Sequence, residues 1–464
     1  MKKKIFNSIF IAIILYSSFI LLKVYFTGRT LWLDEGMLAW SFTQRSLSNL
    51  ISAPFEWLQS APALYLYIVK IITLVLGNTE LTLRLFSIIC YFATIYLSYK
   101  LGKNLKYPLA LSAFVAASST MLRYANEFKP YISDCFAVLL LLYIYRLYKE
   151  GKLKVWLLTL IYVLLVWFSN PACFFIAGII IIEFFKTPKK FFFVGLACLI
   201  SFAVYFLVWL YPVISQGDMT DWWVNQYFPL IPKSKDDLHK AYNMFREISG
   251  PIATPSLDLG IALMAIASLF KNIFSKKHDP VIYASFFGIF IALAASYMTF
   301  YPIECRLWLF VYPLMAYLVF WFIDGLDHIP VIILSLGLIF STNGAVFYSY
   351  PDNAYLPMEE INPIIEYVSD KEEFIYVYND AVPTYCYKNN YQIPKNAMMG
   401  DRYFMEYNKD LDEIKKNDEG YIVISHPYGS RSDGLFEDLE NNNYKIDVVM
   451  EFQQTKLYYF SKNN

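Results

Sequence analysis

Two adjacent carboxylates, Asp34 and Glu35, carry the most readable chemistry in this sequence. They follow an apolar segment long enough to cross a bilayer, and Trp32 stands just before them. Carboxylates at a membrane surface are costly unless they are hydrated or paired. A carboxylate within hydrogen-bond reach of an attacking hydroxyl or amine can take up its proton. The pair is therefore a candidate general base, and the competing interpretation is the hydrated start of an interfacial helix.

Two later segments carry ionisable residues at the ends of apolar stretches. One contains Arg123, Glu127 and Lys129, and the other contains Glu304 and Arg306. Converging cations and carboxylates would bind an anionic group and abstract a proton beside it. For each cation alone, the competing interpretation is a side chain that extends to lipid headgroups. For Glu127 it is an ion pair with Arg123, one helical turn away.

The elements that must position these residues are membrane helices. The chain of 464 residues is 57% hydrophobic and 17% charged, and apolar runs recur from Ile5 to Phe347. A soluble domain of this length would carry more charge. The sequence predicts an α-helical polytopic membrane protein of the inner or plasma membrane, with about eleven spans. Its formal net charge of zero predicts no nucleic-acid partner.

Basic residues predict the orientation of the helices. Lys2, Lys3 and Lys4 place the N-terminus in the cytoplasm, so the acidic pair emerges on the outer face. Four further basic clusters are expected in the cytoplasm, at residues 100–106, 146–154, 186–190 and 271–277. Lys70 interrupts an apolar run, and a lysine at mid-membrane costs about 3 kcal/mol. Residues 62–77 are therefore expected to form a shallow or re-entrant helix on the outer side.

The remaining runs alternate between the two faces of the membrane. One predicted span covers residues 108–122, and Ser169-Asn170-Pro171 is predicted to separate two others, because proline disfavours helix before it. Four external loops follow, at residues 27–60, 122–131, 213–255 and 301–306. Within the first, residues 35–50 and 54–58 mix apolar and polar side chains, as do helices that lie in the membrane plane.

The last part of the chain has the pattern of a small α/β domain. Apolar runs at residues 374–378 and 421–425 predict buried strands, and residues 448–452 and 456–460 predict a final hairpin. Residues 361–368 and 434–439 predict helices between them. We therefore predict a transmembrane domain over residues 1–349 and an extracytoplasmic α/β domain over residues 350–464.

Several common kinds of site are missing from the sequence. It has no P-loop, no G-x-S-x-G elbow and no dinucleotide fingerprint. Its six cysteines and four histidines are not spaced as metal ligands. Asp34, Glu35 and Glu127 are oxygen ligands of the type that divalent metals take, but a hard cation needs more ligands than the sequence assigns. No cofactor is therefore assigned, and a divalent metal stays open.

In their order and spacing, these segments resemble the GT-C class of membrane glycosyltransferases, specifically the bacterial protein mannosyltransferase and aminoarabinose transferase group. The residues that carry the resemblance are Trp32-Leu33-Asp34-Glu35 with Ala39, Pro62-Ala63-Leu64-Tyr65, Leu76-Gly77-Asn78, Leu83-Arg84-Leu85, Arg123-Tyr124-Ala125-Asn126-Glu127 with Pro130-Tyr131, and Arg306-Leu307-Trp308 with Pro313. Many relatives carry a Lys-Pro pair before the re-entrant helix, where this chain has Ala61-Pro62. That departure removes one expected phosphate or substrate contact.

The resemblance implies a sugar donor linked through phosphate to a polyprenol, and transfer to a lipid, glycan or protein acceptor that it does not identify. It implies that Asp34 acts at the reaction centre, with Glu35 beside it and Glu127 as a second acid. It implies a donor phosphate bound by Arg306, Arg123, Lys129 and Arg84, and substrate contacts from Tyr131, Trp32 and Tyr65. A phosphate leaving group needs cations more than a general acid, and a single displacement would invert the anomeric carbon.

Other functions remain open from the sequence. A transporter or lipid flippase places charges within spans near the midplane, whereas here, apart from Lys70 and Glu183, the charges lie at span ends. A polysaccharide polymerase or ligase would rely on arginines and lack the acidic pair. A catalytically inactive binding or scaffold protein is the third alternative.

Overall fold

The computed structural model describes residues 2–215, 234–249, 255–276, 278–343, 358–401, 407–426 and 430–463. The chain divides into two compact units. The first holds residues 1–26, 51–54 and 61–353, and the second holds residues 27–50, 55–60 and 354–464. Most of the first loop, including the acidic pair, is thus grouped with the C-terminal residues, which the sequence did not indicate.

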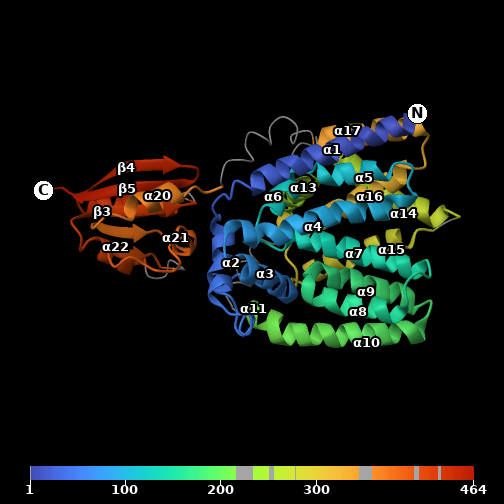
Figure 1. The fold of residues 1–464 in the computed structure, drawn as a ribbon, viewed down its shortest axis with the longest axis horizontal. Helices are drawn as coiled ribbons and strands as arrows, with labels where there is room; N and C mark the ends of the chain where they lie inside the picture. The colour runs from blue at the N-terminus through green and yellow to red at the C-terminus, as the bar shows by residue number, and fades with distance from the viewer. Residues whose placement is uncertain are drawn as a thin grey trace. The chain divides into compact units, whose positions relative to one another are not determined.

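The first unit is helical (Figure 1). Its helices are α1 (Lys2–Tyr25), α3 (Ala63–Leu76), α4 (Glu80–Leu101), α5 (Pro108–Ala116), α6 (Ser119–Ala125), α7 (Tyr131–Lys149), α8 (Val155–Phe168), α9 (Asn170–Phe184), α10 (Pro188–Tyr205), α11 (Tyr211–Ile214), α13 (Lys235–Ser249), α14 (Pro255–Phe274), α15 (Pro280–Tyr297), α16 (Val311–Ile323) and α17 (His328–Asn343). Short helical turns cover Gly102–Asn104, Phe206–Leu210 and Cys305–Trp308.

Among the described residues, five helices are long and apolar enough to cross a membrane: Lys3–Tyr25, Glu80–Asn104, Tyr131–Lys149, Pro188–Ile214 and Pro280–Tyr297. Shorter apolar helices accompany them, including Ala63–Leu76. These helices confirm the predicted helical membrane protein. The number of spans, and whether Ala63–Leu76 crosses the membrane, stay predictions.

Two helices of this unit, α6 and α9, each begin after a serine that caps them. The predicted separation at Ser169 is confirmed, because its Oγ accepts a hydrogen bond from the Ala172 amide at 3.3 Å and α9 begins there. Within the span predicted over residues 108–122, the structure has two helices in place of one. Helix α5 ends at Ala116, and Ser118 Oγ accepts the Met121 amide at 3.2 Å to start α6. A side-chain oxygen just before a helix accepts a hydrogen bond from one of the first amides of that helix. It therefore favours the start of a new helix at this point.

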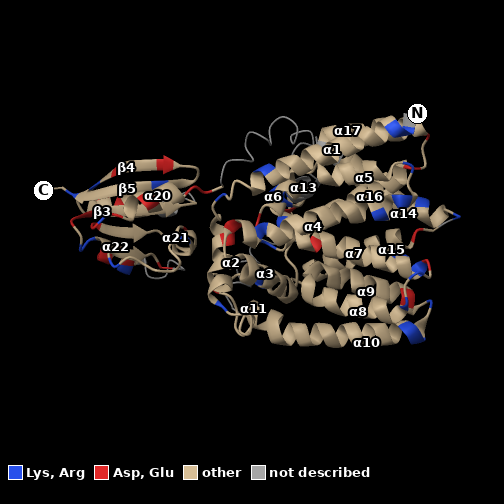
Figure 2. Cartoon of the chain, in the orientation of Figure 1, with Lys and Arg blue, Asp and Glu red and all other residues tan. Residues whose placement is uncertain are grey.

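The basic clusters gather at one end of the first unit, with the N-terminus (Figure 2). Short ion pairs link the elements there. Arg146 of α7 pairs with Asp279, which precedes α15, at 2.6 Å between Nη2 and Oδ2. Lys149 Nζ lies 2.9 Å from Glu183 Oε1 of α9. Arg146 also donates to the carbonyl of Leu101, the last residue of α4. The ends of four helices thus meet here, as the predicted common side of these clusters requires.

The second unit holds a five-stranded sheet of order β2-β1-β3-β5-β4. Its strands are β1 (Phe374–Val377), β2 (Ala397–Met399), β3 (Glu419–Ser425), β4 (Tyr444–Phe452) and β5 (Thr455–Lys462). Strand β1 is parallel to β2 and β3, and β5 is antiparallel to β3 and β4. The helices are α2 (Leu33–Gln44), α20 (Asn362–Val368), α21 (Val382–Lys388), α22 (Tyr407–Ile414) and α23 (Ser430–Asn441).

Alternate residues of the central strands fill two cores. Ile375 and Val423 belong to one cluster of buried side chains, and Tyr376 and Ile422 belong to the other. This alternation follows from the two-residue repeat of a strand. Both predicted strands, the two predicted helices and the final hairpin are confirmed, and β2, α21 and α22 were not predicted.

Aromatic residues of the first loop complete one of these cores. Trp57 is buried in it, and Met37 and Trp40 of α2 pack against it. The Trp40 and Trp57 rings lie 5.9 Å apart, edge to face. The predicted helix over residues 54–58 is wrong, because Trp57 (φ 58°) and Leu58 (φ 51°) have left-handed backbone that a helix excludes.

Candidate active site

The acidic pair begins a helix of the second unit. Helix α2 runs Leu33–Gln44, so Asp34 and Glu35 lie in its first turn. Asp34 is half-buried, whereas Glu35 is fully buried. Glu35 Oε2 accepts the Trp32 amide at 3.4 Å. This geometry is half of a capping box, in which the third helical residue satisfies the amide of the residue before the helix. Trp32 is buried too and packs within the unit.

A buried carboxylate from the C-terminal residues completes this helix start. Glu359 Oε2 accepts the Leu33 amide at 3.1 Å and the Ser425 hydroxyl at 2.8 Å. Its other oxygen, Oε1, lies 2.9 Å from Nδ1 of His426. Thr30 donates its hydroxyl to the Glu359 carbonyl. The first-loop motif is therefore anchored by residues more than three hundred positions away.

Sequence reasoning missed Glu359 and His426. Neither lies in a motif, and the four histidines of the sequence lack the spacing of metal ligands. The local signal is the end of the predicted strand 421–425, which His426 directly follows. Residues at the carboxyl ends of parallel strands are where α/β sheets place functional groups.

His426 is an electrostatic partner of this carboxylate. Burial lowers its pKa, but the contact with Glu359 and the charges of Glu359 and Asp380 outweigh burial and raise the pKa above the usual 6.5. Its backbone is left-handed, with φ 50°, and its amide donates to the Gln454 carbonyl at 2.8 Å. Non-glycine residues in this conformation cost free energy and are held by their surroundings.

Gly36 lets α2 approach helix α21 closely. A Cβ atom there would lie 2.8 Å from Thr384 Oγ1 and 3.2 Å from the Thr384 amide nitrogen. Tyr391, which follows α21, donates its hydroxyl to the Ala39 carbonyl at 3.2 Å and lies 2.6 Å from Thr43 Oγ1. The acidic helix is thus packed along its length by the C-terminal residues.

The second predicted loop lies in the first unit and holds buried charges. Glu127 is fully buried, and its Oε1 lies 3.5 Å from Nε of Arg123. Lys129 and Arg84 are also buried. Ser87, one turn after Arg84 on α4, donates to the carbonyls of Glu127 at 3.0 Å and Lys129 at 3.3 Å. The predicted pair of Glu127 with Arg123 therefore exists, and Ser87 ties the backbone of Glu127 and Lys129 to α4, the helix that carries Arg84.

The predicted substrate-contacting tyrosines of this unit are packed side chains. Tyr65 of α3 is buried and stacks on Phe128, with ring centroids 6.4 Å apart. Tyr131 meets Tyr124 edge to face at 5.3 Å. The structure therefore brings α3 and loop 122–131 together.

Arg306 lies in the helical turn Cys305–Trp308 of the same unit. Its Nε is 3.9 Å from Glu304 Oε1, a long distance for an ion pair, and its side chain is 20% exposed. Burial raises the pKa of the Tyr124 phenol well above its usual range, Glu127 adds to this, and Arg123 and Arg306 lower it. Arg306 is therefore within electrostatic range of the loop that holds Glu127.

The predicted site residues fall into two groups. Trp32, Asp34 and Glu35 belong to the second unit, and Tyr65, Arg84, Arg123, Glu127, Lys129, Tyr131 and Arg306 belong to the first. The first-unit group holds four cations and one carboxylate, a balance that suits an anionic ligand. Much of predicted loop 213–255, including Asp221-Trp222-Trp223, lies outside the described residues.

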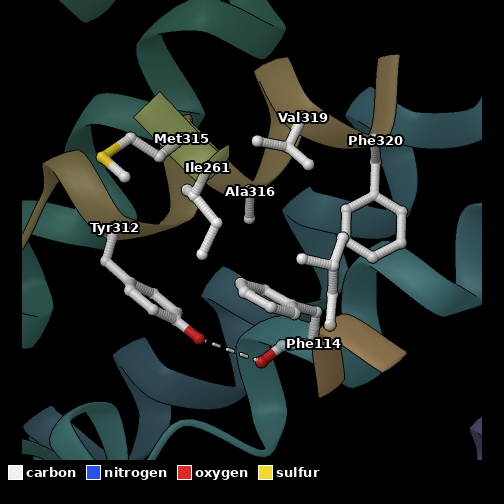
Figure 3. Close-up of a pocket in the computed structure, with 8 residues that line it drawn as sticks. Phe114, Ile261, Tyr312, Met315, Ala316, Val319 and Phe320 are labelled. Carbon is white, nitrogen blue, oxygen red and sulfur yellow. Dashed lines mark hydrogen bonds between the residues drawn. The ribbon is translucent and has the colours of Figure 1, made fainter. Parts of the chain in front are cut away.

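A cavity in the first unit is too small for a lipid donor. It measures about 10 Å³ and is lined by apolar side chains of α5, α14, α16 and α17 (Figure 3). Tyr312 donates its hydroxyl to the Phe114 carbonyl at 3.4 Å at its edge. Such a volume holds at most one water molecule, and none of the predicted site residues lines it. Within the described part of the chain, no group of three or more His, Cys, Asp or Glu residues could hold a metal ion.

Comparisons with known proteins place the fold. Neither a protein-family model nor a curated protein matches the sequence. The crystal structure of ArnT from Cupriavidus metallidurans bound to undecaprenyl phosphate is similar, with a TM-score of 0.58, 10% identity and coverage of 97% of each chain. The apo structure of the same protein gives a TM-score of 0.45 and 12% identity over 97% of each chain. The expected resemblance to GT-C aminoarabinose transferases is thus confirmed as a likeness of fold.

Proposed function

We propose that this protein is an integral membrane glycosyltransferase that moves a sugar from a polyprenyl-phosphate donor to an acceptor, with inversion. The observation that carries the proposal is the likeness of fold, over 97% of each chain, to a transferase crystallised with undecaprenyl phosphate. The four cations of the first-unit group support it, because a polyprenyl phosphate is an anion that arginine holds in a bidentate way.

In the proposed reaction, an acceptor hydroxyl or amine attacks the anomeric carbon of the donor. Its proton passes to the Asp34 carboxylate as the new bond forms. The bond from the anomeric carbon to the phosphate oxygen breaks, and its electron pair leaves with the polyprenyl phosphate. Arg306, Arg123, Lys129 and Arg84 are proposed to neutralise that phosphate. Glu35, which bonds the Trp32 amide, is assigned to orienting the helix start.

Mass spectrometry of membrane lipids and envelope glycans in a deletion strain tests the proposal. We expect a polyprenyl-phosphate sugar to accumulate and one glycan, lipid or protein modification to disappear. Complementation with the wild-type gene should reverse both changes, and complementation with Asp34→Asn should reverse neither. Lipid and glycan profiles that match the parent strain would refute the assignment.

A further inference from the structure

Helix α2 lacks a capping side chain where one is expected. The residue before its first turn is Trp32, whose side chain has no oxygen to accept a helix amide. Serine, threonine, aspartate or asparagine usually fills this position and accepts one of the first amides, none of which has a partner within the helix. Glu359 instead accepts the Leu33 amide at 3.1 Å.

The capping carboxylate is fully buried, which makes its charge costly. A buried carboxylate is retained when hydrogen bonds and an opposite charge offset the loss of water. Ser425 supplies a hydrogen bond at 2.8 Å, and His426 Nδ1 lies 2.9 Å from the second carboxylate oxygen. The positive end of the helix also favours a negative charge at this position.

We propose that Glu359 caps α2 from the C-terminal residues, that His426 holds the Glu359 side chain in place through its Nδ1 contact with Oε1, and that the two act as positioning residues for Asp34. The role for Asp34 rests on the proposed function, whereas the capping itself does not. Asp34 follows Leu33 directly, so a shift in the first turn moves its carboxylate. A displacement of about 1 Å can cost a hundredfold in rate.

The stability of the start of α2 should depend on pH, in a direction that the surroundings of His426 determine. The charged groups that face His426 are Glu359 and Asp380, and Gln454 and the Trp32 ring are its neutral neighbours. Burial lowers the pKa of His426 in the folded protein, but Glu359, Asp380 and Gln454 together raise it above its unfolded value. The stabilisation is therefore complete at low pH and is lost as the pH rises through the folded pKa.

Hydrogen exchange of the full-length protein in detergent tests the capping without any substrate. Between about pH 6 and about pH 9, and after correction for the intrinsic exchange rate, we expect exchange over residues 33–44 of the wild type to rise three- to tenfold, the value of about one helix cap. Peptides from α7 should stay constant. Exchange over residues 33–44 that follows the intrinsic rate alone would overturn the proposal.

Variants then assign the effect to the two side chains. Glu359→Gln and His426→Gln should exchange faster over residues 33–44 at about pH 6 and lose the pH dependence. The matched controls are Glu366→Gln and His239→Gln, which remove exposed side chains of the same types and should behave as wild type. If both test variants retain the wild-type pH response, the pair is not the cap.

Transfer kinetics connect the cap to Asp34. In both variants kcat should fall about tenfold or more with KM little changed, and the alkaline fall of wild-type kcat should follow the exchange data. If the exchange data behave as expected but the wild type transfers no sugar, the capping stands and the proposed function fails. If the wild type transfers sugar and both variants match its kcat, Glu359 and His426 do not position Asp34.

Discussion

The two ends of the first unit balance their charges differently. At the end with the basic clusters, two cations meet carboxylates closely: buried Arg146 and Asp279 are 2.6 Å apart, and Lys149 and buried Glu183 are 2.9 Å apart. At the end with loops 122–131 and 301–306, four cations accompany two carboxylates. The Arg123–Glu127 and Arg306–Glu304 distances there are 3.5 Å and 3.9 Å.

We expect the close pairs at the first end to hold helices together, and the cation-rich group at the second end to contact a ligand. In a short buried ion pair, each charge offsets the other. Removing one member leaves a buried charge without compensation. A surplus of cations is stabilised instead when an anion binds. Charge at the end with the basic clusters should therefore affect folding, and charge near loops 122–131 and 301–306 should affect turnover.

The largest effect is expected at Asp34. Asp34→Asn should lower transfer by about 10²–10⁴, because a positioned base is lost, while thermal unfolding in detergent stays as in wild type. Glu35→Gln should be milder, since Glu35 bonds the Trp32 amide and its amide replacement can still accept that bond. Turnover of a purified polyprenyl-phosphate sugar measures both. Near-normal turnover by Asp34→Asn would remove it as the base.

The opposite outcome is expected at Asp279. Asp279→Asn should lower stability by about 3–5 kcal/mol, because it leaves buried Arg146 without its carboxylate, while turnover per folded molecule is retained. Asparagine can still cap α15 as Asp279 does, so the substitution isolates the charge. Glu150→Gln, which breaks the exposed pair with Lys152, is the control and should unfold as wild type does. Equal stability of the two variants would break the comparison.

An intermediate effect is expected at Arg306. Arg306→Ala should weaken binding of a polyprenyl-phosphate sugar about 10- to 100-fold, and Arg306→Lys should weaken it less, because lysine keeps the charge without the bidentate geometry. Isothermal titration of the solubilised variants gives the dissociation constants. If Arg306 serves only as a headgroup contact or a partner of Glu304, Arg306→Ala will leave donor affinity unchanged.

The smallest effect on the protein is expected from single cysteine substitutions. Their labelling tests whether the two ends of the first unit lie on opposite faces of the membrane. In a background without native cysteines, Asn78→Cys should react with an impermeant maleimide in intact cells, and Lys152→Cys should react only after permeabilisation. Both positions are exposed. Lys129 is predicted to face outside as well, but its side chain is buried and would label poorly. Protection of position 78 in intact cells would show that residues 62–77 cross the membrane.

The sequence predicted those elements whose position is marked by neighbouring residues, such as an apolar run or a proline. The buried strand 421–425 is an apolar run in the centre of the sheet, and the break at Ser169 carries its own proline. The break at Ser118 lies in an apolar run without proline, and β2 is only three residues long, so neither gave a signal.

Contacts between residues far apart in the chain could be predicted only where the topology brings their elements together. The convergence of loops 122–131 and 301–306 was predictable from topology, because both follow apolar runs of the same predicted direction. The bond from Leu33 to Glu359 was not, since nothing near either residue specifies a partner 326 positions away. The burial of Tyr65 likewise depends on Phe128, which belongs to another element.

The separation between Leu33 and Glu359 also determines how much time passes between the synthesis of the acidic helix and the synthesis of its cap. A ribosome adding about 5–20 residues per second needs roughly 15–65 s to cover these 326 positions. During that interval the acidic helix exists without its cap, and Met37 and Trp40 exist without the core they pack against. A polypeptide that terminates early, after α17, would hold every long apolar helix found among the described residues and still lack a finished acidic helix. The acidic helix therefore reaches its final form only after the C-terminal residues have been synthesised.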